Sequence, residues 1–299
     1  MKHLSIDIET KSSVDIGKAG LYRYAQSEDF EILLFAYRYD SGDVQIIDRA
    51  LGENIPDMVL DDLKNPDVVK HAYNAAFEWY CLNRAGYTTP LEQWKCTMIH
   101  GLYCGYTAGL DATGKAIGLP QDKRKLTTGK ALIRYFCTPC RPTKNNGNRI
   151  WNLPKHAPEK WELFKEYCRQ DVITESAILA RLNAFPVPEE EEKLWQMDVR
   201  MNAFGVKVDA GLIGGALQIN DLSENVLENE AREITKLDNP NSAAQLLDWI
   251  HGKGVKMDNL QKATVAEKLS GDLPDDVRRA LEIRQQLGKT SIKKYAAMC

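Results

Sequence analysis

The first hundred residues contain short segments in which apolar and polar side chains alternate. These strand-like runs lie at residues 4–9, 31–39, 44–48, 68–73 and 94–98. Alternation with a period of two separates the side chains onto the two faces of a sheet, so each run predicts a strand. Asp40-Ser-Gly-Asp43 between the second and third runs is typical of a hairpin turn. A helical pattern at residues 74–84 follows the fourth run, and this order predicts an α/β domain with a mixed sheet.

Helical patterns dominate the rest of the chain. We expect short helices at residues 98–105, 109–118 and 128–137. A longer helix is predicted at residues 158–184, because Pro158 suits the first turn of a helix and apolar residues follow along one face. Four prolines and an Asn-Gly pair between residues 139 and 158 predict a long surface loop before this helix.

A domain boundary is expected after this long helix. Phe185-Pro-Val-Pro188 interrupts the helical pattern, and the four acids of Glu189–Glu192 suit the positive end of a new helix. We therefore predict a first domain at residues 1–186 and a mostly helical second domain at residues 187–299. The second domain is expected to contain helices at residues 189–203 and 211–236, a helix capped by Asn241 or Ser242, a last helix from about Pro274 through residue 298, and a short strand at residues 206–208.

Charge is distributed unevenly along the chain, although the net charge is only −3. Residues 1–111 contain 10 Lys and Arg against 17 Asp and Glu, whereas residues 115–160 contain 11 Lys and Arg against 2 acids. An acidic segment that could bind cations therefore precedes a basic segment that could hold phosphates. The alternative for the basic segment is a solvated loop whose lysines serve solubility.

Membrane and secretory classes are not favoured. The longest apolar run, Ile32–Tyr37, has six residues, and Asp7 and Glu9 fall where a signal peptide would be apolar. Seven cysteines with scattered spacing indicate reduced thiols, and the C-x-x-C at Cys137–Cys140 lacks the second pair that a zinc site needs. We expect a cytoplasmic protein without a membrane partner.

Three pairs of polar residues stand at structured positions. They are Asp7 and Glu9, Asn74 and Glu78, and Tyr167 and Asp171. The first pair shares one face of a strand, the second begins a helix after a strand, and the third lies one turn apart on a helix. Each pair alone could be a solvated face or a helix cap, but their order along one α/β layout is a more specific signal.

This order resembles the DEDD superfamily of 3′→5′ exonucleases, which have an RNase H-like fold. The three motifs are Asp7-Ile-Glu9-Thr10, Asn74-Ala-Ala-Phe-Glu78 and Tyr167-Cys-Arg-Gln-Asp171. The histidine subtype would have His five residues before the last Asp, where this chain has Glu166, so the tyrosine subtype fits. Glu78 departs from the pattern, since most of the superfamily has Asp there.

The second half resembles family A DNA polymerases of phage and prophage type. Residues 194–209 are similar to the segment that leads from exonuclease to thumb, Asn241–Leu246 to an N-S-x-x-Q-L motif, and residues 280–291 to a thumb helix. The resemblance implies the N-terminal part of a polymerase, with an exonuclease domain and a partial thumb. The palm and fingers would complete the full-length protein, and this fragment alone is not expected to polymerise.

The resemblance also implies a two-metal site. Two divalent ions, Mg²⁺ or Mn²⁺, would be held by Asp7, Glu9, Glu78 and Asp171. Asp7 would bridge both ions and Tyr167 would orient the attacking water. The candidate nucleic-acid contacts are Thr10, Asn74, Lys123, Arg124, Lys125 and Arg149. The substrate would be a single-stranded or frayed 3′ end of DNA, with primer-template duplex near the thumb.

Two other functions remain open from the sequence. One is an RNase D-like RNA exonuclease of the same fold, against which the thumb-like motifs argue. The other is a DNA-binding module of the polymerase whose exonuclease is weak or inactive, against which the retained acids and tyrosine argue.

Overall fold

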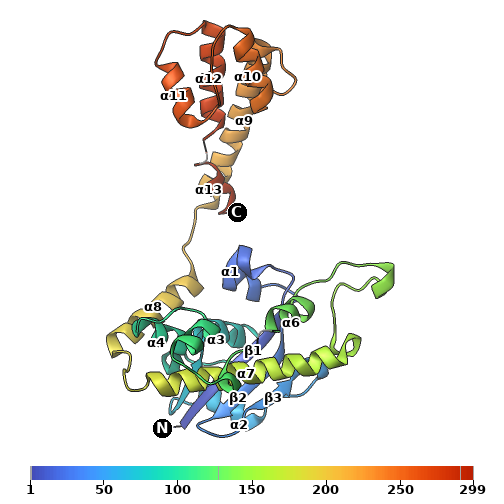
Figure 1. Cartoon of the computed structure of the whole chain (residues 1–299), viewed down its shortest axis with the longest axis vertical. Coiled ribbons are helices and arrows are strands. Elements are labelled where there is room, and N and C mark those ends of the chain that lie inside the picture. Colours follow the sequence, from blue (N-terminus) through green and yellow to red (C-terminus); the bar gives the residue numbers. More distant parts are fainter. Residues whose placement is uncertain (1, 127, 290, 299) are drawn as a thin grey trace. The chain divides into compact units, whose positions relative to one another are not determined.

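The chain forms two compact units, residues 1–205 and 206–299, each with its own hydrophobic core (Figure 1). The structure, a computed structural model, describes residues 2–126, 128–289 and 291–298. Cys299 and one position of the thumb-like motif at residues 280–291, Thr290, lie outside the described residues. The six described cysteines form no disulfides.

The first unit is built on one five-stranded mixed sheet. Its strands are β1 (Lys2–Lys11), β2 (Glu31–Tyr39), β3 (Gln45–Asp48), β4 (Val68–Ala72) and β5 (Trp94–Cys96). They lie in the order β3-β2-β1-β4-β5, with β1–β2 and β2–β3 antiparallel and β1–β4 and β4–β5 parallel. The predicted α/β class with a mixed sheet is confirmed.

Eight α-helices of the first unit are described. They are α1 (Ile16–Ala25), α2 (Asp57–Lys64), α3 (Ala75–Arg84), α4 (Thr97–Tyr103), α5 (Leu110–Ala116), α6 (Gly129–Phe136), α7 (Pro158–Leu182) and α8 (Glu189–Phe204). The sequence patterns predicted α3 to α8 to within a few residues but not α1 and α2. Among the described residues, no helix is both long enough and apolar enough to cross a membrane.

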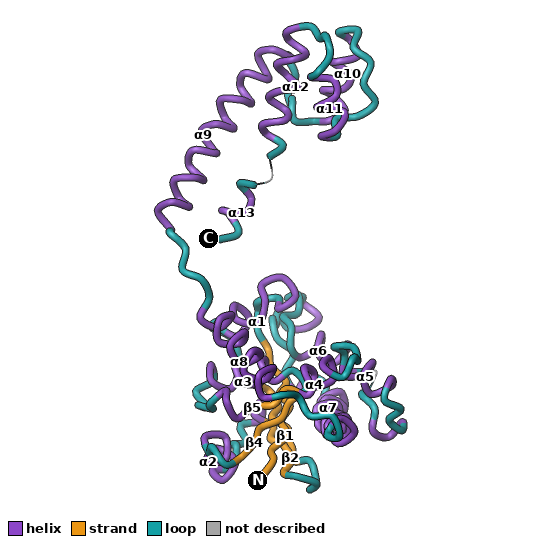
Figure 2. Tube along the Cα trace, turned by 90° about the vertical axis from the view of Figure 1, so that its left-hand side faces the viewer, coloured by secondary structure: helices purple, strands orange, loops and turns teal. Residues whose placement is uncertain are grey.

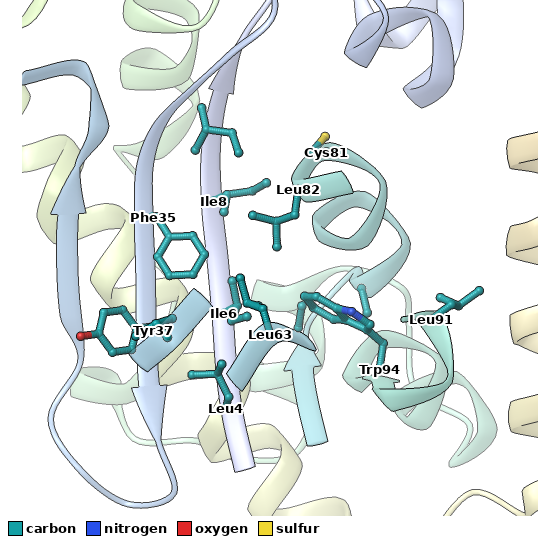
Figure 3. Packing of buried hydrophobic residues seen from close by; sticks show 14 of the residues in the cluster. Leu4, Ile6, Ile8, Phe35, Tyr37, Leu63, Cys81, Leu82, Leu91 and Trp94 are labelled. Carbon is teal, nitrogen blue, oxygen red and sulfur yellow. The ribbon is translucent and has the colours of Figure 1, made fainter. Parts of the chain in front are cut away.

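The two faces of the sheet have separate apolar layers. Leu4, Ile6 and Ile8 of β1 pack in the layer that includes α2 and α3, as Figure 3 shows for one part of it. The other layer joins β2 to α6 and α7. In Figure 2, α2 and α3 lie on one side of the sheet and α7 on the other. The alternating pattern of β1 therefore leaves its polar positions on the α7 side.

A β-bulge interrupts the pairing of β1 with β2. Glu9 pairs with Leu34, but the next residue, Thr10, pairs with Ile32, so Leu33 is the extra residue. Leu33 and Leu34 both belong to the apolar layer on the α7 side, whereas Ile32 belongs to the opposite layer. The bulge therefore lies directly opposite one of the two acids of β1.

The division of the chain lies at residues 205/206 rather than at the predicted 186/187. Helix α8 packs against the first unit, because Val199 is buried in its core and Trp195 lies against that core. The Tyr22 hydroxyl also donates a hydrogen bond of 3.4 Å to the Val199 carbonyl. The prolines at residues 186–188 thus separate two helices of one unit.

The second unit is helical. It contains α9 (Ala210–Thr235), α10 (Ala243–Gly252), α11 (Lys262–Leu269), α12 (Asp275–Leu287) and α13 (Lys293–Ala296). Its core includes Leu246, Ile250 and Leu281. The Arg279 guanidinium donates hydrogen bonds of 2.6 and 2.9 Å to both carboxylate oxygens of Glu230, which links α12 to α9.

Two predictions for the second unit are wrong. Residues 206–208 form no strand, because no strand of the described residues lies beside them to pair with, and Val206 is 91% exposed. The last helix does not continue through residue 298: α12 ends at Leu287, where Gly288 follows, and α13 is a separate short helix. Glycine has a low helix propensity, and this favours the break.

The stacked aromatic residues of α7 should dominate the stability of the first unit. Phe164 is fully buried between Phe136, Trp161 and Tyr167, whereas its neighbour Leu163 is 54% exposed. We expect Phe164→Ala to lower the free energy of unfolding by about 3–5 kcal/mol. Leu163→Ala, the matched control, should change it by about 0.5 kcal/mol or less. Urea denaturation measures both, and equal losses would contradict this packing.

Candidate active site

Five acidic side chains from distant parts of the chain meet at one edge of the sheet. They are Asp7, Glu9, Glu78, Asp171 and Glu175, and we call them the acidic cluster. Asp7 and Glu9 lie in the carboxyl-terminal half of β1, and Glu78 lies in the first turn of α3, which follows β4. Because β1 and β4 are parallel, these ends share one edge of the sheet. Helix α7 crosses this face and brings the other two acids (Figure 1).

Most of the acidic cluster is buried. Glu78 is only 5% exposed, so it is not the solvated helix acid that its position near a helix start also allowed. Asp7 is partly buried, and it lies on the central strand of the sheet rather than on one of the two outer strands. Burial, together with repulsion from Asp171, raises the pKa of Asp7 to about 8. Burial and the charge of Asp7 also raise the pKa values of Glu9 and Glu78.

Two carboxylate oxygens of the cluster have no hydrogen-bond partner among the described residues. They are Oε2 of Glu78 and Oδ1 of Asp171, and both are buried. Glu175 differs, because Thr97 donates to its Oε1 and Ser176 donates to its Oε2 at 3.3 Å. Since buried polar atoms are nearly always paired, the two open oxygens indicate a place for a bound ligand.

Cys168 is a neighbour of the cluster that the sequence did not indicate. Its Sγ donates to Oδ2 of Asp7 at 3.4 Å. One ligand atom each of Asp7, Glu9 and Cys168 lie within 4.8 Å of one another. Burial raises the pKa of the Cys168 thiol well above its ordinary value, so the thiol stays protonated and donates to Asp7.

The donor set fits divalent metal ions that prefer oxygen. Carboxylates are the ligands that Mg²⁺ and Mn²⁺ favour, and Asp7, Glu9, Glu78 and Asp171 offer them within one cluster. Burial and the charges of neighbouring acids raise the pKa values of Asp7, Glu9 and Glu78, so a bound cation would relieve that repulsion. The two unpaired oxygens are free to coordinate it. Glu175 is the member whose oxygens are already occupied.

Tyr167 is held rigidly beside Asp171. It precedes Asp171 by one helical turn, and its ring stacks on Phe164 with centroids 6.2 Å apart. Burial, followed by the nearby acids, raises the pKa of Tyr167, so the hydroxyl stays protonated. Gly129 lies against the ring: a Cβ at this position would lie 2.0 Å from Cε2 of Tyr167. A side chain at position 129 is therefore incompatible with this tyrosine position.

The basic residues among the candidate nucleic-acid contacts differ in the partners that they have in the structure. Lys125 forms an ion pair with Oδ2 of Asp171, and its ammonium lies 4.6 Å from the centre of the Tyr167 ring. Arg124 donates to the Leu119 carbonyl at 2.7 Å. Of these basic candidates, only Lys125 has a described contact with the acidic cluster.

Lys123 and Arg149 have no described contact with the acidic cluster. Lys123 is exposed. Arg149 donates to Asn152 at 2.9 Å and to the Asn146 carbonyl at 3.2 Å, within its own loop. The structure therefore gives both residues a place on the surface but no described partner in the acidic cluster.

A cavity of about 410 Å³ borders the acidic cluster. Its lining includes Glu9, Thr10, Tyr24, Phe77 and Ile133. The Thr10 hydroxyl is buried and hydrogen-bonded to the Tyr24 hydroxyl at 2.7 Å. A lining that combines hydroxyl and carboxyl groups with apolar side chains suits a small ligand with a polar and a flat part.

Asn74 is exposed at the start of α3. Its side chain makes no capping hydrogen bond to the helix. The helix-cap role that the sequence also allowed is therefore not its role here. Among the described residues the Asn74 amide has no hydrogen-bond partner, so it is available to a ligand.

The chain is similar over its whole length to part of a phage protein. It is 47% identical over 299 residues to a protein described as "DNA polymerase" from Bacillus phage SP02. The alignment covers 100% of this chain and 46% of that polymerase, so the chain spans about half the length of the curated relative. No protein-family model matches the chain.

A solved structure described as "apo form of the nuclease" has a distant likeness to the chain. It is 16% identical, with a TM-score of 0.39. The superposition covers 67% of this chain and 82% of that one. A likeness this distant carries no conclusion about fold or function.

The acidic cluster should make stability depend on pH. In the unfolded chain carboxyl groups titrate near pH 4, whereas Asp7 keeps its proton up to about pH 8 in the folded state. The folded state then binds more protons, so the free energy of unfolding should fall as pH rises from about 4 to about 8. Asp7→Asn should reduce this slope in urea denaturation of the metal-free protein. The exposed Asp198→Asn is the control, and equal slopes in both variants would contradict the assignment.

The contact between Gly129 and Tyr167 can be tested by adding one methyl group. Gly129→Ala should lower the free energy of unfolding by about 1–3 kcal/mol, because the ring must move. The matched control is Gly101→Ala in α4, whose Cβ would be no closer than 3.7 Å to Thr113. We expect the control to be neutral or stabilising, as alanine favours helix. Urea denaturation measures both variants. Equal changes in their free energies of unfolding would contradict this packing.

Proposed function

We propose that the first unit is a metal-dependent 3′→5′ exonuclease of the DEDD type, with an RNase H-like fold, in a family A DNA polymerase. The observation that carries this proposal is the convergence of Asp7, Glu9, Glu78 and Asp171, with Tyr167 one helical turn from the last of them. These are the residues of three motifs that lie far apart in the sequence. Their burial with two unpaired oxygens supports a site for cations rather than a solvated surface.

The similarity to a phage DNA polymerase supports the polymerase context of this proposal. In that context, DNA is the partner and the hydrolysis removes mispaired 3′ nucleotides as proofreading. The helical second unit, residues 206–299, would be part of the thumb, which contacts primer-template duplex. The palm and fingers of the full-length protein would supply polymerisation. This reading also makes the protein an intracellular enzyme of a phage or prophage.

The proposed metal ligands are Asp7, Glu9, Glu78 and Asp171, for two divalent ions, Mg²⁺ or Mn²⁺. Bound divalent ions activate water as a nucleophile and stabilise the oxygen that leaves the phosphate. Glu78 is longer than the more usual Asp, yet its position in the first turn of α3 keeps it buried in the cluster with one oxygen open.

The side chains around the ligands suit positioning roles. The protonated Tyr167 hydroxyl, on the helical turn before Asp171, can hydrogen-bond the attacking water and orient it toward the phosphate. Cys168 holds Asp7 by a hydrogen bond from its thiol. Gly129 and Phe164 confine the Tyr167 ring, so the hydroxyl has little freedom to leave this orientation.

The cavity beside Glu9 is a candidate site for the terminal nucleoside. Its volume of about 410 Å³ lies within the range typical of small-ligand pockets. Phe77 and Ile133 would contact the base, and Thr10 would contact the sugar. Asn74 is free to hydrogen-bond the strand.

The basic residues nearby would hold the phosphates of the strand. Lys123, Arg124, Lys125 and Arg149 are the proposed contacts. Lys125 carries its positive charge beside the acids, and the four basic residues together would attract and align a polyanion. Lys123 is the exposed member of the group.

The test uses 5′-labelled single-stranded DNA with Mg²⁺ or Mn²⁺. We expect a ladder that shortens from the 3′ end and that disappears with EDTA. Asp7→Ala should lower the rate of DNA shortening by at least about 100-fold, because it removes a proposed ligand of the metal ions. Tyr167→Phe should lower it by about tenfold or more, while folding normally. The exposed Asp198→Ala serves as the control and should leave the rate unchanged.

Other outcomes would select other functions. Intact DNA together with a gel shift would favour a DNA-binding module with an inactive exonuclease. Faster degradation of RNA of the same sequence would favour an RNase D-like enzyme. Release of the 5′ label as a mononucleotide without a ladder of shortened strands would contradict the polarity.

A further inference from the structure

Lys125 provides a positive charge inside the candidate site. Among the described salt bridges it is the partner of the acidic cluster, through Oδ2 of Asp171. Its side chain is 28% exposed, whereas that of Asp171 is 6% exposed. The cluster contains five acids, so one ammonium compensates only part of their charge.

The position of Lys125 in the chain allows its ammonium to leave. The residue lies between the 3-10 turn at Gln121–Lys123 and helix α6, in neither helix nor strand. Its long stem reaches over the Tyr167 ring, to which the ammonium makes a cation–π contact of 4.6 Å. The backbone here is therefore not tied into the sheet that holds the acids.

The ammonium and a metal ion require the same carboxylate. Oδ1 of Asp171 is unpaired and Oδ2 binds Lys125. A divalent ion held by Asp171 would lie close to the ammonium, and two cations at such short range repel each other strongly in a buried site. Binding of the ion therefore breaks or weakens the ion pair between Lys125 and Asp171.

We propose that Lys125 is a built-in competitor of the metal ion: it neutralises Asp171 when the site is metal-free and is released when a divalent ion binds. This inference rests on the proposed function, since it needs the cluster to bind metal. It adds a role for a residue that was otherwise only a candidate phosphate contact. The released ammonium would stay near the Tyr167 ring, over which it already lies.

The first test measures binding of Mn²⁺ alone by isothermal titration, without DNA. Lys125→Gln should bind Mn²⁺ roughly tenfold more tightly than the wild type, because the competing charge is gone. Lys125→Arg keeps the charge and should bind like the wild type. Lys130→Gln, which removes an exposed charge five residues away, is the matched control and should also bind like the wild type. Unchanged or weaker Mn²⁺ binding by Lys125→Gln would overturn the proposal.

The second test needs no variant and covers the case in which Lys125→Gln does not fold. Lysine side chains of the wild-type chain are acetylated with and without saturating Mn²⁺ and quantified by mass spectrometry. Release of the ammonium should raise the labelling of Lys125 several-fold and leave that of Lys130 unchanged. Equal labelling of Lys125 in both conditions would falsify the competition.

The outcomes also separate this inference from the proposed function. If the wild type binds no Mn²⁺ in the titration, the proposed metal site fails and the competition fails with it. If the wild type and Lys125→Gln bind Mn²⁺ equally well, the competition alone fails. The exonuclease assay on the wild type is independent of both measurements.

Discussion

Mutual repulsion among buried carboxylates is the constraint on which the first unit depends. Charged groups removed from water destabilise a fold unless protons, cations or hydrogen bonds compensate them. Here Asp7 and Glu9 are fixed by the central strand, and α7 brings Asp171 against them. The apolar layers on both faces of the sheet supply the stability that holds these groups together. Thr97, Cys168 and Lys125 each compensate one acid by a direct contact.

The parts of the site that follow a local rule could be predicted from the sequence. Alternation along a strand puts Asp7 and Glu9 on one face, and spacing by four on a helix puts Tyr167 beside Asp171. Glu78 could be placed because helices that follow parallel strands begin at one edge of a sheet. The strands could be predicted for the same reason, because alternating side chains of a strand lie on the two opposite faces of the sheet.

Contacts between distant segments could not be predicted in this way. Nothing in the sequence near Lys125 specifies Asp171 as its partner, because a loop conformation brings them together. Cys168 and Gly129 have ordinary sequence neighbours, and their roles arise only from packing against Asp7 and Tyr167. The strand predicted at residues 206–208 failed for a related reason: alternation needs a neighbouring strand to become a sheet.

The bulge opposite Glu9 has a consequence for how the protein can change over time. Because Leu33 is an extra residue, the two halves of β2 are out of phase, and Ile32 and Phe35 face one layer while Leu33 and Leu34 face the other. Loss of Leu33 would restore a regular ladder and would leave Ile32, Leu34 and Phe35 each facing its present layer. Loss of a residue from the regular part of β2 would instead turn one half of the strand over, so the strand should tolerate a change of length at the bulge better than elsewhere.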